Sequence, residues 1–347
     1  MQRILAAKRT EVDPRTVVCM VRVIETSQVS VVTGAGSTSR TDERFGIHGT
    51  DLGIVWDGGD GRLYVLFGDT YGRGWGGDGG GPPEADWRCN VLAFSSTREL
   101  SAGLELDEVV AREDGGATQV IASGRGREAT VIPNAGIAVD GRQYVHYMSV
   151  REWGPPGRWD TNYSGIAVSE DGGRSWHKPR SARWKNRRRR DHPFQIGAFA
   201  RDSEYVYLYG TTNGRFDDAY LARVSPAELL NARAYRYWTP DGWVSDEYAA
   251  APVFTGPVGE LSVEYDVHFG RWLAMHLDEH RAAIVLRTAA RPEGPWSEGE
   301  VVVSGQDYPG LYGGYLHPWA LDGEDIYFLL SQWGPYNVYL MRARLAP

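Results

Sequence analysis

Short runs of β-type residues, separated by turn residues, recur along almost the whole chain. Typical runs are LGIVWD (52–57), RLYVLFGD (62–69) and IYFLLSQW (326–333). Apolar or alternating runs of this length, bounded by Gly, Pro, Asn or Asp, indicate strands rather than helices. The 43 Gly and 18 Pro supply turns, and the 19 Tyr and 13 Trp suit sheets. The sequence therefore predicts an all-β fold.

The strands group into five larger units, each reading as strand, turn, strand, turn and an outer strand. The units span residues 46–100, 128–180, 193–243, 257–304 and 310–347. Four-stranded units spaced by about 50 residues favour a five-bladed β-propeller that forms one catalytic domain over residues 1–347. Residues 26–36 are expected to add an outer strand to the last blade, which closes the ring and hides the sheet edges. A pair of β-sandwiches remains the alternative architecture.

Two local patterns carry further structural predictions. Residues 169–176, SEDGGRSW, fit the S-x-D-x-G-x-x-W pattern of an Asp box, which stabilises a hairpin turn and does not catalyse. Residues 225–238, SPAELLNARAYRYW, interrupt the β pattern. Ser225 and Glu228 have the spacing of a capping box, with Pro226 at the first helical position, so a helix is predicted there.

Charge and composition limit the classes of partner that this protein is expected to bind. A formal net charge of −8 and an isoelectric point near 5.6 argue against a nucleic-acid partner. The basic run 183–193, RWKNRRRRDHP, is interpreted as a solvated loop between two blades, with contact to anionic envelope material as the alternative. No signal peptide or membrane span is visible, so the localisation stays open. Cys19 and Cys89 are expected to be buried free thiols rather than zinc ligands.

The hairpin of residues 49–70 carries an aspartate at each outer end. If residues 58–62 form its loop, Asp57 pairs with Leu63 and Asp51 lies directly opposite Asp69. Opposed Cβ atoms are about 5 Å apart, and like charges that close raise one pKa. Such an asymmetric pair suits general acid and base catalysis. The alternative is that each aspartate only caps a strand end by accepting turn amides.

Motifs spread along the chain resemble one known family. They are GTDLGIVWD, LYVLFGDT, ATVIPNAGIAV, NYSGIAVSEDGGRSW, YGGYLHPW and WGPYNVYLMR, in order between residues 46 and 344. Together they resemble the domain-of-unknown-function family 4185, members of which are assigned as endo-D-arabinanases of glycoside hydrolase family 183. The resemblance implies hydrolysis of the D-arabinofuranose polymers of mycobacterial arabinogalactan and lipoarabinomannan, on a five-bladed propeller. The same polymer, D-arabinan, is then the expected partner.

The resemblance also implies an inverting mechanism with the catalytic pair on Asp51 and Asp69. Inverting enzymes hold an acid and a base about 6.5–9.5 Å apart, with room for a water between the base and the sugar. Asp51 is assigned as the base and Asp69 as the acid, with the reverse left open. Glu260, at the start of a later strand, is the third catalytic candidate.

Sugar binding calls for aromatic platforms and neutral hydrogen-bonding groups. The candidates in the matched motifs are Asn134, Asn162, Tyr163, Gln195, Tyr312, His317, Trp319, Trp333 and Asn337. The glycine-rich residues 72–83 are interpreted as a mobile loop beside the site that could close over substrate. No cofactor or metal is expected to be required, although a structural calcium ion stays open. Hydrolysis of another furanoside, and sugar binding without catalysis, are the competing functions.

Overall fold

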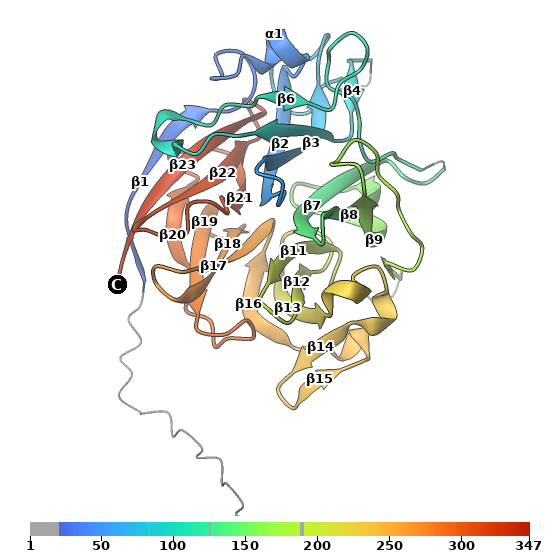
Figure 1. Ribbon diagram of the computed structural model, residues 1–347, viewed down its shortest axis with the longest axis vertical. Coiled ribbons are helices and arrows are strands. Elements are labelled where there is room, and N and C mark those ends of the chain that lie inside the picture. Colours follow the sequence, from blue (N-terminus) through green and yellow to red (C-terminus); the bar gives the residue numbers. More distant parts are fainter. Residues whose placement is uncertain (1–20, 83, 125, 188–190) are drawn as a thin grey trace, which may run out of the picture.

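Five antiparallel sheets surround a central axis in the computed structural model, which describes residues 21–82, 84–124, 126–187 and 191–347 (Figure 1). Each sheet is one blade, and the innermost strand of every blade contacts the innermost strands of its two neighbours. The last of these contacts joins the fifth blade to the first, so the ring is closed. The prediction of an all-β, five-bladed β-propeller is confirmed.

The blades are described by their strands, from the axis outward. The innermost strands are β2 (Gly49–Asp57), β7 (Thr130–Val139), β11 (Ile196–Arg201), β17 (Leu261–Asp266) and β21 (Leu311–Leu316). The second strands are β3 (Leu63–Tyr71), β8 (Arg142–Trp153), β12 (Val206–Thr211), β18 (Arg271–Asp278) and β22 (Asp325–Gln332). The third strands are β5 (Val91–Ser95), β9 (Trp159–Ser169), β13 (Asp217–Val224), β19 (Ala283–Ala289) and β23 (Asn337–Ala346).

Shorter elements complete the blades. The outer strands are β6 (Glu108–Val109), β10 (Arg183–Lys185), β14 (Arg236–Thr239), β15 (Gly242–Val244), β20 (Glu300–Ser304) and β1 (Arg22–Val31). Two further strands, β4 (Trp87–Arg88) and β16 (Pro252–Val258), pair with β3 and β13. The helical elements are α1 (Thr41–Phe45) and the short 3₁₀ turns Leu100–Ala102, Pro226–Glu228, Ala232–Ala234 and Glu247–Ala249.

Strand β3, the second strand of the first blade, is apolar over much of its length because this blade is covered on both faces. Residues 63–67 of β3 are fully buried, and burial on both faces is what turns an alternating pattern into a continuous apolar run. Neighbouring blades also approach each other closely where a glycine, which has no side chain, lies between them. A Cβ on Gly136 would lie 2.2 Å from the Trp56 ring, so this glycine lets β7 pack directly on the indole of the first blade.

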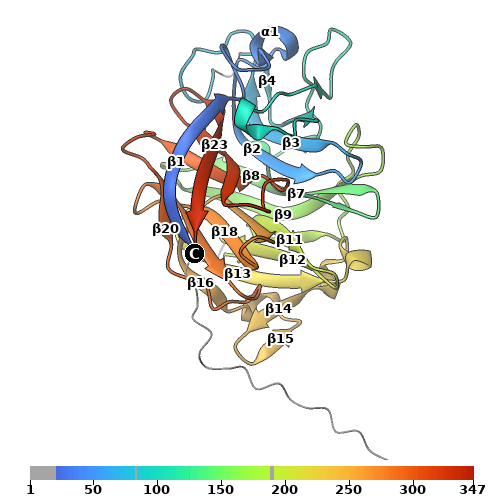
Figure 2. The ribbon, with the colours of Figure 1, turned by 60° about the vertical axis from the view of Figure 1, so that its left-hand side comes forward.

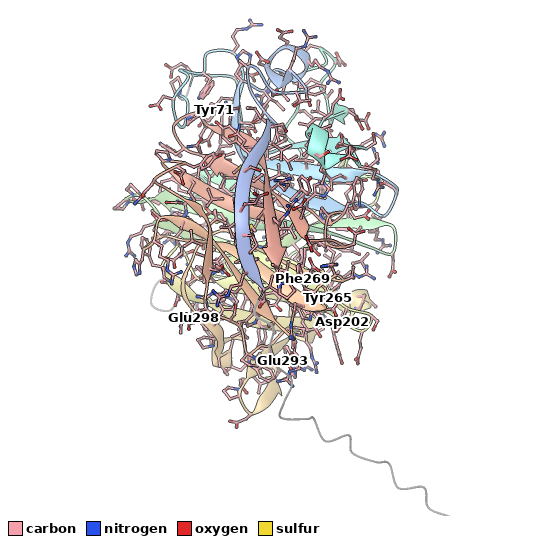
Figure 3. All side chains as sticks on the ribbon, turned by 90° about the vertical axis from the view of Figure 1, so that its left-hand side faces the viewer. Tyr71, Asp202, Tyr265, Phe269, Glu293 and Glu298 are labelled. Atoms are coloured by element: carbon pink, nitrogen blue, oxygen red, sulfur yellow. The ribbon has the colours of Figure 1, made fainter. Side chains whose placement is uncertain are left out.

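The N-terminal strand β1 closes the ring by pairing with β23 of the last blade. The pairing is antiparallel and runs from Arg22 opposite Ala346 to Val31 opposite Tyr339. Figure 2 shows β1 beside β23, and Figure 3 shows β1 from outside the molecule. This confirms the predicted closing strand, which begins at Arg22 rather than near residue 26.

The helix predicted for residues 225–238 is wrong. The segment forms two 3₁₀ turns and then β14, and the Ser225 side chain caps neither of them. Its buried residues are Leu229, Tyr235 and Tyr237, a spacing that no single helical face provides. Packing of these side chains between the second and third blades therefore overrides the capping signal.

The Asp box forms a tight turn, as expected. Asp171 accepts hydrogen bonds from the Ser175 amide at 2.9 Å and hydroxyl at 2.6 Å, and the Trp176 indole donates to the Gly173 carbonyl at 2.9 Å. These bonds hold the connection that follows β9.

The interpretation of residues 183–193 as a solvated loop is wrong at three positions, because Trp184, His192 and Pro193 are buried. Trp184 donates a 2.8 Å hydrogen bond to the Tyr237 hydroxyl. Residues 188–190, at the centre of the run, lie outside the described residues. Strand β10 explains the burial of Trp184, because this side chain packs among residues of the second and third blades.

Of the two cysteines, Cys89 is a buried free thiol, as predicted, and Cys19 lies outside the described residues. In the part of the chain that the structure describes, no helix has the length and apolar character needed to cross a membrane.

Candidate active site

A cavity of about 660 Å³ opens at the end of the propeller where the innermost strands begin. It falls in the size range of small-ligand sites, which is about 300–1,000 Å³. Every blade contributes to its wall. The residues with polar or aromatic side chains in the wall are Asp51, Asp69, Tyr71, Trp153, Arg158, Trp159, Arg215, Glu260, Glu279, Tyr312, Trp333 and Tyr336.

The two aspartates of the first hairpin both line this cavity, although not in the predicted register. Asp57 pairs with Leu63, so the loop is residues 58–62 as expected. Further along, Thr50 pairs with Thr70 but Leu52 pairs with Phe67, which leaves Asp51 opposite both Gly68 and Asp69. The exact opposition predicted from the sequence is therefore wrong, because a β-bulge intervenes, and bulges re-aim side chains.

Backbone conformation around Asp51 fits this irregularity. Leu52 has a φ of 67° and Gly53 a φ of 81°, both in the left-handed region. On the partner strand, a Cβ at Gly68 would lie 2.4 Å from Asp51 Oδ1. Only glycine at that position leaves room for the Asp51 carboxyl group.

The Asp51 carboxyl group is held in a desolvated position. The Tyr312 hydroxyl donates a 3.0 Å hydrogen bond to Oδ2, whereas Oδ1 is buried and has no partner among the described residues. Burial, followed by the nearby charge of Asp69, raises the pKa of Asp51 to about 8, against the opposing effect of the Tyr312 bond. Asp51 therefore keeps its proton at neutral pH.

Asp69 has a more polar environment. The Trp87 indole and the Thr130 hydroxyl each donate a 3.0 Å hydrogen bond to Oδ1. Burial raises the pKa of Asp69 to about 6, and these two bonds limit the rise. At neutral pH the pair therefore carries one proton, held by Asp51. This electrostatic order favours Asp51 as acid and Asp69 as base, the reverse of the assignment made from the sequence.

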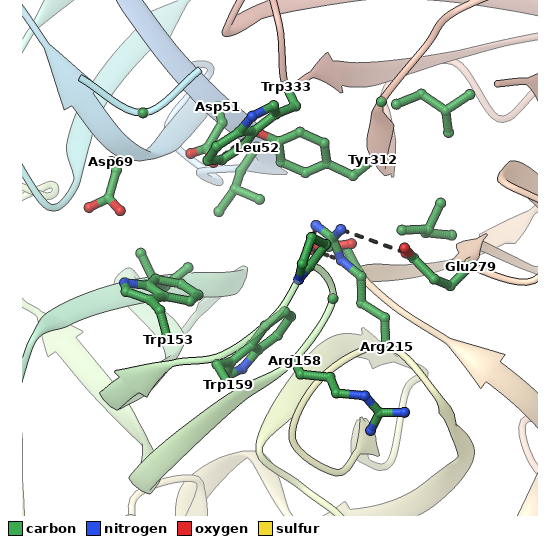
Figure 4. Close-up of a pocket in the computed structure, with 18 of the residues that line it drawn as sticks. Asp51, Leu52, Asp69, Trp153, Arg158, Trp159, Arg215, Glu279, Tyr312 and Trp333 are labelled. Carbon is green, nitrogen blue, oxygen red and sulfur yellow. Dashed lines mark hydrogen bonds and ion pairs between the residues drawn. The ribbon is translucent and has the colours of Figure 1, made fainter. Parts of the chain in front are cut away.

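Glu260 also lines the cavity, where it forms an ion pair. Its Oε1 accepts bonds from Arg215 Nε at 3.0 Å and Nη2 at 2.7 Å, and Glu279 lies 3.7 Å from the same guanidinium (Figure 4). Glu260 Oε2 is buried and has no partner among the described residues. Because Arg215 compensates the charge of Glu260, this carboxylate is suited to binding or positioning a group rather than to proton transfer.

Of the nine predicted binding residues, Tyr312 and Trp333 line the cavity. The other seven lie outside its wall: Asn134, Asn162, Tyr163, Gln195, His317, Trp319 and Asn337. Most of them bond within the fold. Gln195 is fully buried, accepts from Thr161 and donates to the Trp184 carbonyl. The Trp319 indole donates to Asp57, at the opposite end of β2 from Asp51.

Sequence reasoning missed several residues of the wall. Trp153, Arg158 and Trp159 come from the β8–β9 hairpin, and Arg215 and Glu279 come from loops of the third and fourth blades. These residues reach the cavity because the blades converge, and nothing near them in the sequence marks that convergence. The one local signal for these residues is Trp153 itself, an aromatic residue that ends a strand pattern directly before the turn residues of GPPG.

The glycine-rich segment lies beside the site, with Gly80 in the cavity wall. Its main chain is tied to the last blade, since the Gly79 amide donates to the Gly334 carbonyl at 2.9 Å. Within the segment, the Trp75 indole donates to the Gly79 carbonyl at 3.0 Å. These bonds place residues 75–79 at the rim of the cavity, and the predicted mobility of the loop stays a prediction.

Among residues 21–82, 84–124, 126–187 and 191–347, no three His, Cys, Asp or Glu side chains are grouped so that they could hold a metal ion. A structural calcium ion stays a hypothesis.

Comparison with known proteins gives the family. The model of a family described as a domain of unknown function, DUF4185, matches residues 36–342. The chain belongs to the DUF4185 family. Two relatives of this DUF4185 protein are notoamide biosynthesis cluster protein J of an Aspergillus species (strain MF297-2) and protein J′ of Aspergillus versicolor. They are 32% and 30% identical to it, and each alignment covers 86% of this chain and 83% or 84% of the relative.

Solved structures share the fold of the DUF4185 protein. A putative hydrolase from Bacteroides ovatus superposes with a TM-score of 0.61 at 13% identity, over 86% of each chain. An exo-β-1,3-galactanase from Phanerochaete chrysosporium gives 0.55 at 12% identity, over 93% of this chain and 64% of the other. The catalytic domain of a GH62 α-L-arabinofuranosidase from Coprinopsis cinerea gives 0.53 at 14% identity, over 93% and 98%.

Proposed function

We propose that this protein is an inverting glycoside hydrolase that cleaves internal glycosidic bonds of D-arabinofuranose polymers. The observation that carries the proposal is the pair Asp51 and Asp69, which line one cavity and whose surroundings raise their pKa values to about 8 and about 6. Two carboxyl groups with separated pKa values are what acid and base catalysis at neutral pH requires. The fold shared with a galactanase and an arabinofuranosidase supports a glycosidase. The sequence motifs support D-arabinan as the substrate.

The proposed reaction uses the two carboxyl groups on opposite sides of the anomeric carbon. Asp51 donates its proton to the departing glycosidic oxygen. Asp69 accepts a proton from a water molecule, and that water attacks the anomeric carbon from the far side. The positive charge that develops on the sugar ring is stabilised by the ionised Asp69. Single displacement by water inverts the anomeric configuration.

The walls of the cavity favour an uncharged sugar. Aliphatic side chains of Ile132, Met148, Leu277 and Leu311 contribute apolar surface. The half-buried guanidinium of Arg215 is already compensated by Glu260 and Glu279, so it offers little attraction to a phosphate or carboxylate of the substrate. Furanose rings have apolar faces and neutral hydroxyl groups, which this mixture of surfaces can contact.

The test is hydrolysis of mycobacterial arabinogalactan by the wild type and by the variants Asp51→Asn and Asp69→Asn. Released oligosaccharides are separated by chromatography, and the first anomer formed is identified by NMR. Each variant is expected to lose activity by about 10²–10⁴-fold, the usual contribution of general acid or base catalysis. Asp57→Asn, at the exposed far end of the same strand, is the matched control and should remain active.

Other outcomes would redirect the proposal. Full activity in either Asn variant of the pair would remove the mechanism. Binding of the polymer without release of products by the wild type would instead make the protein a carbohydrate-binding propeller. Cleavage of L-arabinan in preference to arabinogalactan would retain the chemistry and change the substrate, because the fold alone does not choose the sugar.

A further inference from the structure

Exposed tryptophans gather around the cavity. All 13 tryptophans lie in the described part of the chain, and three of them are exposed: Trp87 at 39%, Trp153 at 50% and Trp333 at 56%. Trp153 and Trp333 line the cavity, and Trp87 donates a hydrogen bond to Asp69. Tryptophan is usually well buried, so an exposed set confined to one opening indicates a surface kept for a ligand.

Trp153 is exposed but firmly held. It ends β8 opposite Trp159, and the edge-to-face contact of their rings has a centroid distance of 5.8 Å. The tip of the same hairpin is anchored to the third blade, because the Arg215 amide donates to the Gly157 carbonyl at 3.0 Å. A ring supported by its neighbour and by the main chain loses little conformational freedom when a ligand stacks on it.

Trp333 is supported in a similar way on the other side. Its ring meets Tyr336 edge to face at 5.5 Å, and its amide donates to the Gly310 carbonyl at 2.9 Å. The glycine-rich segment packs closely on the indole, since a Cβ at Gly79 would lie 2.9 Å from Nε1. Figure 4 shows Trp333 on the side of Asp51 and Trp153 on the side of Asp69, with the cavity between them.

We propose that Trp153 and Trp333 are two sugar-stacking platforms, which hold the polymer on both sides of the bond that is cut. The inference rests on the proposed function and extends it by assigning a role to Trp153. The apolar face of a furanose ring can lie against each exposed indole, as apolar groups commonly do on aromatic side chains. With one platform on either side of the aspartates, a stretch from within the polymer fills the site better than a chain end.

The experiment measures binding separately from catalysis. In an Asp51→Asn background, the affinity for linear D-arabinofuranose oligosaccharides of increasing length is measured by calorimetry, with and without Trp153→Ala. In the active enzyme, kcat and KM on arabinogalactan are compared for the same tryptophan change. Trp153→Phe tests rescue by another aromatic ring. Trp243→Ala, on the outer hairpin of the third blade, is the matched control.

Trp153→Ala is expected to weaken binding of the longer oligosaccharides about tenfold, equivalent to about 1.4 kcal/mol, while the shortest bind as before. On the polymer, KM should rise with kcat nearly unchanged, and Trp153→Phe should recover most of the loss. If Trp153→Ala leaves affinity and KM unchanged while the wild type is active, the stacking role of Trp153 is overturned and the proposed function stands. A wild type that neither cleaves nor binds D-arabinan would overturn the proposed function and this inference together.

Discussion

The two carboxylate oxygens of Asp69 differ in their hydrogen bonds. Its Oδ1 accepts two hydrogen bonds, from Trp87 and Thr130, and its Oδ2 accepts none among the described residues. The free oxygen is the one suited to take a proton from water. Asp51 is buried beside the charge of Asp69, and both effects raise its pKa, so it holds its own proton more strongly although the Tyr312 phenol donates to it.

These pKa values predict a bell-shaped dependence of kcat/KM on pH. Activity falls as the pH drops through about 6, because the Asp69 base becomes protonated. It also falls as the pH rises through about 8, because the Asp51 acid loses its proton. Initial rates on arabinogalactan across this range check the shape. A flat profile across both limits would contradict the assignment.

Removing one hydrogen bond to Asp69 should shift only the acidic limb of the pH profile of kcat/KM. Trp87→Phe deletes the indole donor to Asp69, which favours the ionised form, so the pKa of Asp69 should rise. We expect the acidic limb to shift upward by about one pH unit, since a bond to a charged group contributes roughly 1.5–3 kcal/mol when fully formed and Trp87 is partly exposed. The alkaline limb, set by Asp51, serves as the internal control.

At the scale of strands and turns, the sequence predicted the elements well where local chemistry decides them. The hairpin loop 58–62 and the Asp box both depend on residues within a few positions of each other. The bulge beside Asp51 was not predictable in this way, because it depends on the space at Gly68 and on a bend at Leu52 and Gly53. The helix predicted near Ser225 failed for a related reason, since contacts between blades outweighed its local capping signal.

The Asp box should contribute to stability and not to activity. Asp171→Ala removes the acceptors for the Ser175 amide and hydroxyl, with an expected cost of about 1–3 kcal/mol at about 0.5–1.5 kcal/mol for each of the two bonds. Thermal unfolding should therefore begin a few degrees lower, whereas kcat/KM of the folded enzyme stays the same. Glu170→Ala, which removes only an exposed ion pair, is the control and should change neither.

For the whole molecule, the ring was predictable from its repeats, but most of the cavity wall was not. Asp51 was predictable from its place at the outer end of the first hairpin, and Glu260 from its place directly before β17, because the inner strands of a propeller meet at one axis. Arg215, in a loop of the third blade, and Trp153, at the end of β8, reach the same cavity in a direction that depends on how the blades are set against each other. Conversely, Gln195 has the position of a site residue in its own strand, yet it is buried in contacts with its neighbours.

Closure by β1 predicts a global effect of a small deletion. A variant that begins at residue 32 lacks β1 and exposes the edge of β23 to solvent. Exposed edges pair with other chains, so this variant should unfold at a lower temperature and associate more than the full chain. Calorimetry and light scattering after size-exclusion chromatography measure both effects. Ile24→Ser, at an exposed position of β1, should leave both unchanged.

The same closure has a consequence for the timing of activity. Asp51 belongs to the first blade, whereas its phenol partner Tyr312 and the neighbouring Trp333 belong to the last. A ribosome delivers these two groups at nearly opposite ends of synthesis, and they meet only when the last blade has joined the first. A nascent chain, or one that ends before the last blade, therefore has no complete site, so the proposed hydrolysis requires a chain whose last blade has been made.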